Sequence, residues 1–229
     1  MKITLIKPAI TRTVQHSRLV SWNMEPLSIA ILAGLTPKEI DLEFFDERMQ
    51  ALPEKFDSDL VGITCETFTA RRTYELSDKI RDQGIPVILG GYHVTLIPAE
   101  ARAHADAVVI GEAPGVWLNL INDIKSGVLK PVYSNEEIIF SNRLPDRSIF
   151  ARYKYLPVNL VQTSRGCPNQ CEFCATAGVF KGRVRFRDQG SVIEEIKSCR
   201  HKHILFVDEN IVIDPRRARE LFTALIPLK

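Results

Sequence analysis

Three cysteines that lie close together late in the chain are its most chemically distinctive feature. Cys167, Cys171 and Cys174 are separated by three and then two residues, and they follow an apolar run at 158–163 that we expect to be a strand. One loop therefore offers three thiolates and no fourth ligand. Such a set can hold a metal ion or an iron–sulfur cluster and leave one coordination position open for a substrate.

Composition narrows the class of protein. The chain has 229 residues, of which 45% are hydrophobic, enough for one large domain or two small ones. A net charge of +2 gives no support for a nucleic-acid or membrane-surface partner. Three of the five cysteines are clustered, unlike a secreted disulfide framework, and no apolar run approaches the length of a transmembrane segment. We therefore expect a protein of the reducing cytoplasm.

A group of basic residues follows the cysteine loop. It consists of Arg183, Arg185 and Arg187, which alternate with apolar residues. Charges in this pattern are more often the solvated face of a strand than a phosphate site. We therefore predict that these three side chains face solvent.

The first part of the chain alternates short β-rich runs with amphipathic stretches, which favours βα units and a parallel sheet. The expected strands are 2–6, 42–45, 59–64, 86–89 and 107–110. The expected helices run over about 27–33, 69–83 and 114–125. Five parallel strands with helices between them predict an α/β fold, a doubly wound sheet of the flavodoxin-like kind.

A connecting segment divides the sequence. Residues from about 130 to 157 are rich in proline and turn-forming residues. We assign a first domain to 1–140, a linker to 141–157 and a second domain to 158–229. The second domain is expected to contain strands at 158–163 and 204–207 and helices at about 191–199 and 215–226.

The carboxyl ends of the predicted strands of the first domain carry polar residues and glycines. Ligands of doubly wound sheets bind at this edge. The residues at the ends of the third, fourth and fifth strands are Thr64, Cys65, Glu66 and Thr67; Gly90, Gly91, Tyr92 and His93; and Gly111 and Glu112. The adjacent glycines let a bulky ligand approach the backbone. The alternative is that they only make a tight turn.

The cysteine loop, with Phe173 before its last cysteine, closely resembles the signature of the radical S-adenosylmethionine (radical SAM) enzymes. The resemblance implies that Cys167, Cys171 and Cys174 hold three irons of a [4Fe–4S] cluster. It also implies that S-adenosylmethionine chelates the fourth iron and is cleaved to a 5′-deoxyadenosyl radical, with Phe173 near the adenine. An electron donor such as flavodoxin or ferredoxin would supply the electron. These cofactors carry the difficult chemistry, and the protein positions them.

The wider sequence resembles radical SAM enzymes with an N-terminal cobalamin-binding domain. By that resemblance, Asp208, Glu209 and Asn210 follow the second strand of a partial TIM barrel and help to hold S-adenosylmethionine. The alternative for these three residues is a helix-capping turn. In the first domain the implied ligand is cobalamin, lying across the strand-end residues named above. No Asp-x-His-x-x-Gly string is present, so we do not expect His16 or His93 to ligate cobalt.

The resemblance implies radical methylation of an unactivated carbon in a small-molecule or lipid-like substrate, with skeletal rearrangement as a close variant. Two other classes remain open. The chain could be a cofactor-binding module without turnover, or the cysteine loop could be a structural zinc site with Cys199, His201 or His203 as fourth ligand. A phosphorylated signalling receiver is disfavoured, because the first and third strands do not end in carboxylates. Since only the first βα units of a barrel are present, we also expect the 229 residues to be part of a longer enzyme.

Overall fold

The computed structural model describes residues 1–10, 23–135, 137, 139–140 and 143–228. His16 and part of the predicted linker therefore lie outside the described residues. The chain divides into two compact units, Met1–Lys154 and Tyr155–Lys229.

The first unit is built on a six-stranded parallel sheet with the order β2-β1-β3-β4-β5-β6. The strands are β1 (Lys2–Lys7), β2 (Asp41–Asp46), β3 (Leu60–Thr64), β4 (Val87–Gly90), β5 (Ala107–Gly111) and β6 (Val132–Asn135). The central strands are apolar runs because helices cover both faces of the sheet. The predicted flavodoxin-like order is confirmed over the first five strands.

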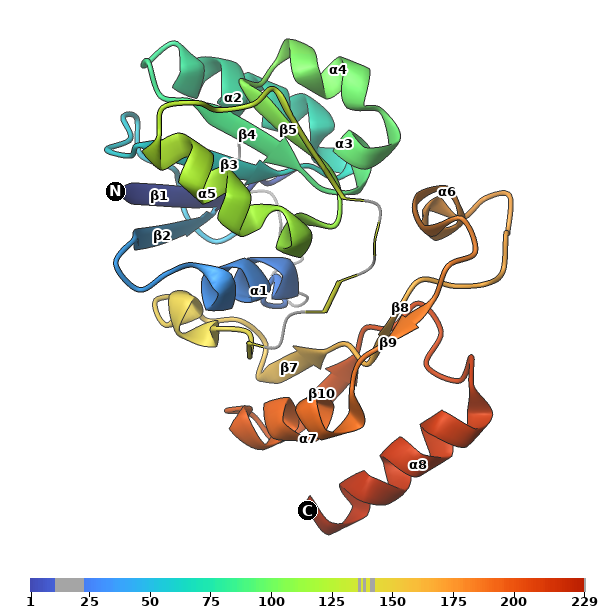
Figure 1. The fold of residues 1–229 in the computed structure, drawn as a ribbon. Helices are drawn as coiled ribbons and strands as arrows, with labels where there is room; N and C mark the ends of the chain where they lie inside the picture. The colour runs from blue at the N-terminus through green and yellow to red at the C-terminus, as the bar shows by residue number, and fades with distance from the viewer. Residues whose placement is uncertain (11–22, 136, 138, 141–142, 229) are drawn as a thin grey trace. The chain divides into compact units, whose positions relative to one another are not determined.

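Helices cover the two faces of this sheet (Figure 1). On one face lie α1 (Leu27–Leu35) and α5 (Trp117–Lys125), which contact each other. On the other face lie α2 (Ala70–Arg81), α3 (Tyr92–Leu96) and α4 (Pro98–Ala103). Short 3-10 turns, η3 (Thr67–Thr69) and η4 (Ala113–Gly115), precede α2 and α5. The apolar side of α2, which connects β3 to β4, packs on both of these strands.

The segment predicted to be a connector is partly built into the first unit. Its residues 132–135 form β6, which pairs in parallel with β5, so the prediction of five strands was one strand short. A 3-10 turn, η5 (Arg147–Phe150), contacts α1 and β2, and the Asp146 N–H donates to the Ala30 carbonyl over 2.8 Å. A four-residue strand among prolines and turn formers gives a weak sequence signal, which explains the omission.

The second unit begins with two parallel βα units. Strands β7 (Val158–Val161) and β10 (His203–Phe206) pair in parallel, and the helices are α7 (Gln189–Ser198) and α8 (Pro215–Leu225), followed by η6 (Ile226–Leu228). Carboxylates cap both helices: Asp188 accepts from the Ser191 N–H, and Asp214 accepts from two N–H groups of α8. Within the described part of the chain, no helix is long and apolar enough to cross a bilayer.

Candidate functional site

The cysteine loop is carried by a short antiparallel pair of strands in the second unit. These are β8 (Ser164–Arg165) and β9 (Arg185–Phe186), and the loop between them contains the short helix α6 (Ala175–Phe180). All three cysteines are free thiols: Cys171 is exposed, whereas Cys167 and Cys174 are half-buried. The ring of Phe173 is 93% exposed, so it is available to a ligand rather than packed in the core.

Cys174 has the electrostatics of a good ligand. It immediately precedes α6, and the Ala177 backbone N–H lowers the pKa of the thiol most, followed by the Thr176 side chain and backbone. The charge of Glu209 acts in the opposite direction and raises the pKa of Cys174. The net effect favours the thiolate, the form that binds metal.

Cys199, His201 and His203 are the residues expected to offer a fourth ligand if the cysteine loop were a closed zinc site. In the part of the chain that the structure describes, no three Cys, His, Asp or Glu side chains are arranged as a ready-made metal site. Cys199 packs against the apolar cluster of Val161, Val192 and Leu221. His201 is exposed, and it is its backbone carbonyl that accepts a hydrogen bond from Asn159. These contacts give no support for a fourth ligand from this segment.

The first leg of the loop is tied to the end of β10. The Asp208 carboxylate accepts hydrogen bonds from the backbone N–H and the hydroxyl of Thr163 and of Ser164, at 2.5–3.1 Å. Glu209 accepts from the Gly166 N–H at 3.0 Å, directly before Cys167. Asn210 accepts from the Val212 N–H in a local turn. Asp208 and Glu209 therefore contact the loop that carries the cysteines.

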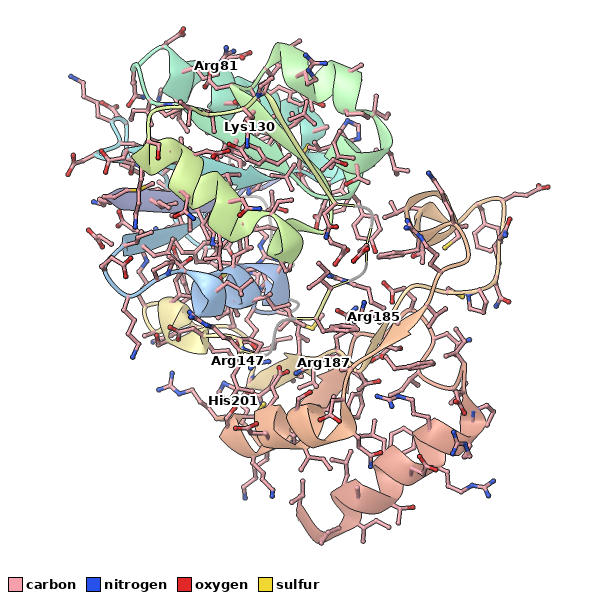
Figure 2. The ribbon with its side chains drawn as sticks, viewed as in Figure 1. Arg81, Lys130, Arg147, Arg185, Arg187 and His201 are labelled. Carbon is pink, nitrogen blue, oxygen red and sulfur yellow. The ribbon has the colours of Figure 1, made fainter. Side chains whose placement is uncertain are left out.

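The second leg is anchored by a buried ion pair. Arg187 Nη1 lies 2.5 Å from Glu195 Oε2 of α7 and donates to the Gln162 carbonyl at 2.9 Å. The Arg187 N–H also donates to the Thr163 carbonyl. Figure 2 labels Arg187 and Arg185. The prediction that the arginine group is solvated is correct for Arg183 and Arg185, which are exposed, but wrong for Arg187, which is 9% exposed.

The predicted strand-end residues of the first unit meet at one edge of its sheet. The Cys65 N–H donates to the Gly90 carbonyl at 2.7 Å, and the His93 N–H donates to the Cys65 carbonyl. Thr95 links Gly91 to Gly111, because its hydroxyl donates to the Gly91 carbonyl and accepts from the Gly111 N–H. The loops after β3, β4 and β5 therefore form one hydrogen-bonded surface.

Three residues that sequence reasoning missed complete this edge: Lys7, Thr95 and Asn135. Lys7 is nearly buried at the end of β1 and pairs with Glu66 at 2.7 Å. The Asn135 carbonyl, at the end of β6, accepts from the Glu112 N–H at 3.0 Å. The only sequence signal for Asn135 was the short run of Val132 and Tyr133 before it.

Burial separates the inner residues of this edge from the outer ones. Cys65 is fully buried, and burial raises the pKa of its thiol to about 11, so it is a packing residue at neutral pH. His93 is 5% exposed, with Nδ1 at 3.3 Å from the Thr67 hydroxyl and Nε2 at 3.4 Å from Glu100. Thr67 and Tyr92 lie on the outside and are exposed.

The two adjacent glycines have different reasons to be glycine. Gly91 has φ +118°, and a Cβ there would lie 2.5 Å from the Cys65 carbonyl oxygen. A Cβ on Gly90 would meet only the Val109 side chain, at an ordinary 3.6 Å. The tight-turn interpretation therefore holds for Gly91. Gly90 does not need to be glycine for packing.

We expect Gly91→Ala to lower the free energy of unfolding by about 1–3 kcal/mol from backbone conformation alone. The clash with the Cys65 carbonyl adds to this loss. Gly90→Ala is the matched control and should leave the stability within about 0.5 kcal/mol of the parent. Urea unfolding of the two variants measures the difference, and equal stability of both variants would contradict the assignment.

Known proteins resemble this chain over both of its units. Residues 21–121 match the family model described as B12 binding domain. The chain is 32% identical over 217 residues to bacteriochlorophyllide d C-12(1)-methyltransferase of Chlorobaculum tepidum, covering 89% of this chain and 48% of that protein. It is 31% identical over 221 residues to the C-8(2)-methyltransferase of the same organism, covering 86% and 49%. The chain therefore spans about half the length of these curated relatives.

A solved structure has the same fold across both units. The radical S-adenosylmethionine methyltransferase TsrM of Kitasatospora setae, solved with cobalamin and a [4Fe–4S] cluster, aligns with a TM-score of 0.73. The alignment covers 99% of this chain and 51% of that chain at 14% identity. The predicted fold class, a flavodoxin-like sheet followed by the first parallel βα units of a second domain, is confirmed.

Proposed function

We propose that this chain, a homologue of the cobalamin-dependent radical SAM methyltransferases, binds a [4Fe–4S] cluster, S-adenosylmethionine and cobalamin and serves radical methylation of an unactivated carbon. The observation that carries the proposal is the cysteine loop. Three free thiols and an exposed aromatic ring lie on one loop, and both legs of that loop are anchored to the ends of a parallel sheet. A flexible surface loop would not need such anchoring.

In this proposal Cys167, Cys171 and Cys174 are the cluster ligands. When bound, the cofactors would supply three things: an electron, a methyl group, and a radical that removes a hydrogen atom from the substrate. The chain's own task is to hold the three cysteine thiolates in place, so that the cluster rather than another metal is bound. The lowered pKa of Cys174 keeps that thiol ready to bind. Phe173 projects into solvent and offers its ring for stacking on the adenine of S-adenosylmethionine.

The edge of the first unit is the proposed corrinoid surface. Gly90 has no side chain, so a ligand can approach its backbone closely, and the exposed rings of Phe68 and Tyr92 lie in the segments that follow β3 and β4. A large, partly apolar macrocycle suits such a surface. The remaining proposed contacts are Thr64, Glu66, Thr67, Gly91, Gly111 and Glu112, whereas the side chains of Cys65 and His93, which were also expected to contact the ligand, are buried beneath this surface.

We expect bound cobalamin to have no protein nitrogen below the cobalt. The ring of His93 is buried, and both of its nitrogens face side-chain partners, so it is not presented to a ligand. Electron paramagnetic resonance of the cobalt(II) form should therefore lack the hyperfine splitting of an axial nitrogen, with the cofactor's own base displaced. A nitrogen splitting that His93→Ala removes would overturn this expectation.

The names of the relatives support a proposal for the substrate class. Two of them are named for methylation of bacteriochlorophyllide d, and another is a hopanoid C-2 methylase. We propose a small, largely apolar or lipid-like molecule for this protein. We further propose a flavodoxin or ferredoxin as the electron donor, and action in the reducing cytoplasm.

Turnover distinguishes an enzyme from a binding module. The reconstituted protein, given S-adenosylmethionine and a chemical reductant without oxygen, should release 5′-deoxyadenosine. Cys171→Ala is the control, because it removes a proposed ligand that is exposed and makes no packing contact essential to the core. Cluster binding without any release of 5′-deoxyadenosine would favour the module.

A further inference from the structure

We propose that Asp208 is a positioning residue that fixes the cysteine loop, rather than a residue that binds S-adenosylmethionine. The proposal rests on the proposed function, because it concerns how the cluster loop is held. It differs from the role that the resemblance implied for Asp208. The reason lies in the contacts that this carboxylate already makes.

One oxygen of the Asp208 carboxylate, Oδ1, is fully used by the backbone and hydroxyl groups of two consecutive residues. It accepts from the Thr163 N–H at 3.1 Å, the Thr163 hydroxyl at 2.7 Å, the Ser164 N–H at 2.5 Å and the Ser164 hydroxyl at 2.6 Å. The other oxygen, Oδ2, accepts from the Thr163 N–H at 3.1 Å. A carboxylate offers about four lone-pair sites. To bind the amino group of a ligand through Oδ1, Asp208 would have to give up donors that are themselves buried, and the carboxylate would have to turn away from Thr163 and Ser164.

The register of the sheet brings these groups together. Phe206, the last residue of β10, pairs with Val161, the last residue of β7. The Val207 N–H also donates to the Val161 carbonyl at 2.9 Å, so the hydrogen bonding continues one residue beyond the end of β10. Asp208 therefore lies opposite the turn where the chain leaves β7 for β8. Thr163 and Ser164 are 4% and 2% exposed, so no water can replace the carboxylate without opening the turn.

This turn sets where the cysteines begin. Ser164 starts β8, and Gly166, with φ +87°, directly precedes Cys167. Asp208 holds the start of the leg, and Glu209 holds Gly166 at its end. Removing the Asp208 charge frees the backbone N–H groups that fix the direction of β8, and Cys167 loses its defined place relative to β10.

The first test needs no cofactor. Hydrogen exchange of the full chain should show protected amides at Thr163 and Ser164, and Asp208→Asn should lower their protection roughly tenfold or more, the scale of a lost charge-assisted hydrogen bond. Asp214→Asn is the matched control, because that carboxylate caps α8 in the same unit by accepting from the Arg216 and Arg217 N–H groups rather than from Thr163 or Ser164. Unchanged protection in Asp208→Asn would overturn the proposal.

The second test separates positioning from ligand binding. Thr163→Val with Ser164→Ala removes the two hydroxyl partners and leaves Asp208 in place. If Asp208 acts through the loop, this pair and Asp208→Asn should each speed the loss of iron to a chelator, and their combination should add little. The electron paramagnetic resonance spectrum of the reduced cluster should change in both. If Asp208 binds S-adenosylmethionine, only Asp208→Asn weakens its binding, and iron content and amide protection stay at the parent level. Failure of the parent protein to take up iron would refute the proposed function instead, and the exchange result would still decide the role of Asp208.

Discussion

Replacing any one of Cys167, Cys171 and Cys174 by alanine is expected to abolish iron binding. The parent chain, reconstituted without oxygen, should bind about four irons and four sulfides, the content of one [4Fe–4S] cluster. With three thiolates, only one of the four irons has no protein ligand. If one cysteine is lost, two irons have no protein ligand, and we expect that the cluster is no longer held. The effect on iron content should be all or none, and it is measured by iron and sulfide analysis together with the visible absorption of the cluster.

Two other cysteines serve as matched controls. Cys65 is fully buried in the first unit, and Cys199 packs against Val161, Val192 and Leu221. Replacing either of them by alanine should leave about four irons per chain. A parent protein that holds one zinc and takes up no iron would show that the cysteine loop is a structural zinc site and that the proposed function is wrong.

Breaking the Arg187–Glu195 pair is expected to have the largest effect on stability in the second unit. Glu195 is fully buried and Arg187 is 9% exposed, so removing either partner leaves a charge in a region without water. Arg187→Ala or Glu195→Ala should lower the free energy of unfolding of this unit by about 3–5 kcal/mol. The Gln162 carbonyl also loses its donor in Arg187→Ala. Hydrogen exchange at β7, β10 and α7 measures the loss.

A surface ion pair and a double variant test whether the burial of the Arg187–Glu195 pair is the cause of the loss of stability. Arg216 and Glu220 form an exposed pair one turn apart on α8, and its removal should cost at most about 0.5 kcal/mol. Replacing Arg187 by Met and Glu195 by Leu together should restore much of the stability, because no charge then has to be buried at this position. If Arg187→Ala is no more destabilising than Arg216→Ala, the buried pair does not anchor the loop. Protection of the first unit should not change in any of these variants.

Local chemistry along the chain determined the main features of this protein. The spacing of Cys167, Cys171 and Cys174 is a property of neighbouring residues, so a loop that offers three thiolates could be predicted without coordinates. The same is true of the alternation of strands and helices. The strand-end residues could also be predicted as a group, since the carboxyl ends of parallel strands meet at one edge. The ring of His93 contacts the Thr67 hydroxyl and Glu100, and the expectation from the missing Asp-x-His-x-x-Gly string that it does not ligate cobalt stays a prediction.

Only the tertiary structure decided which polar residues face solvent and which are buried. Arg187 alternates with exposed arginines in the sequence, yet it is buried because α7 places Glu195 against it. Asp208 and Thr163 are far apart in sequence, and only the pairing of β7 with β10 brings the carboxylate to the turn. Gly90 and Gly91 look alike until the Cys65 carbonyl is placed beside one of them. Each of these contacts depends on the distance between groups that are not neighbours in sequence, and that distance is set only when the chain folds.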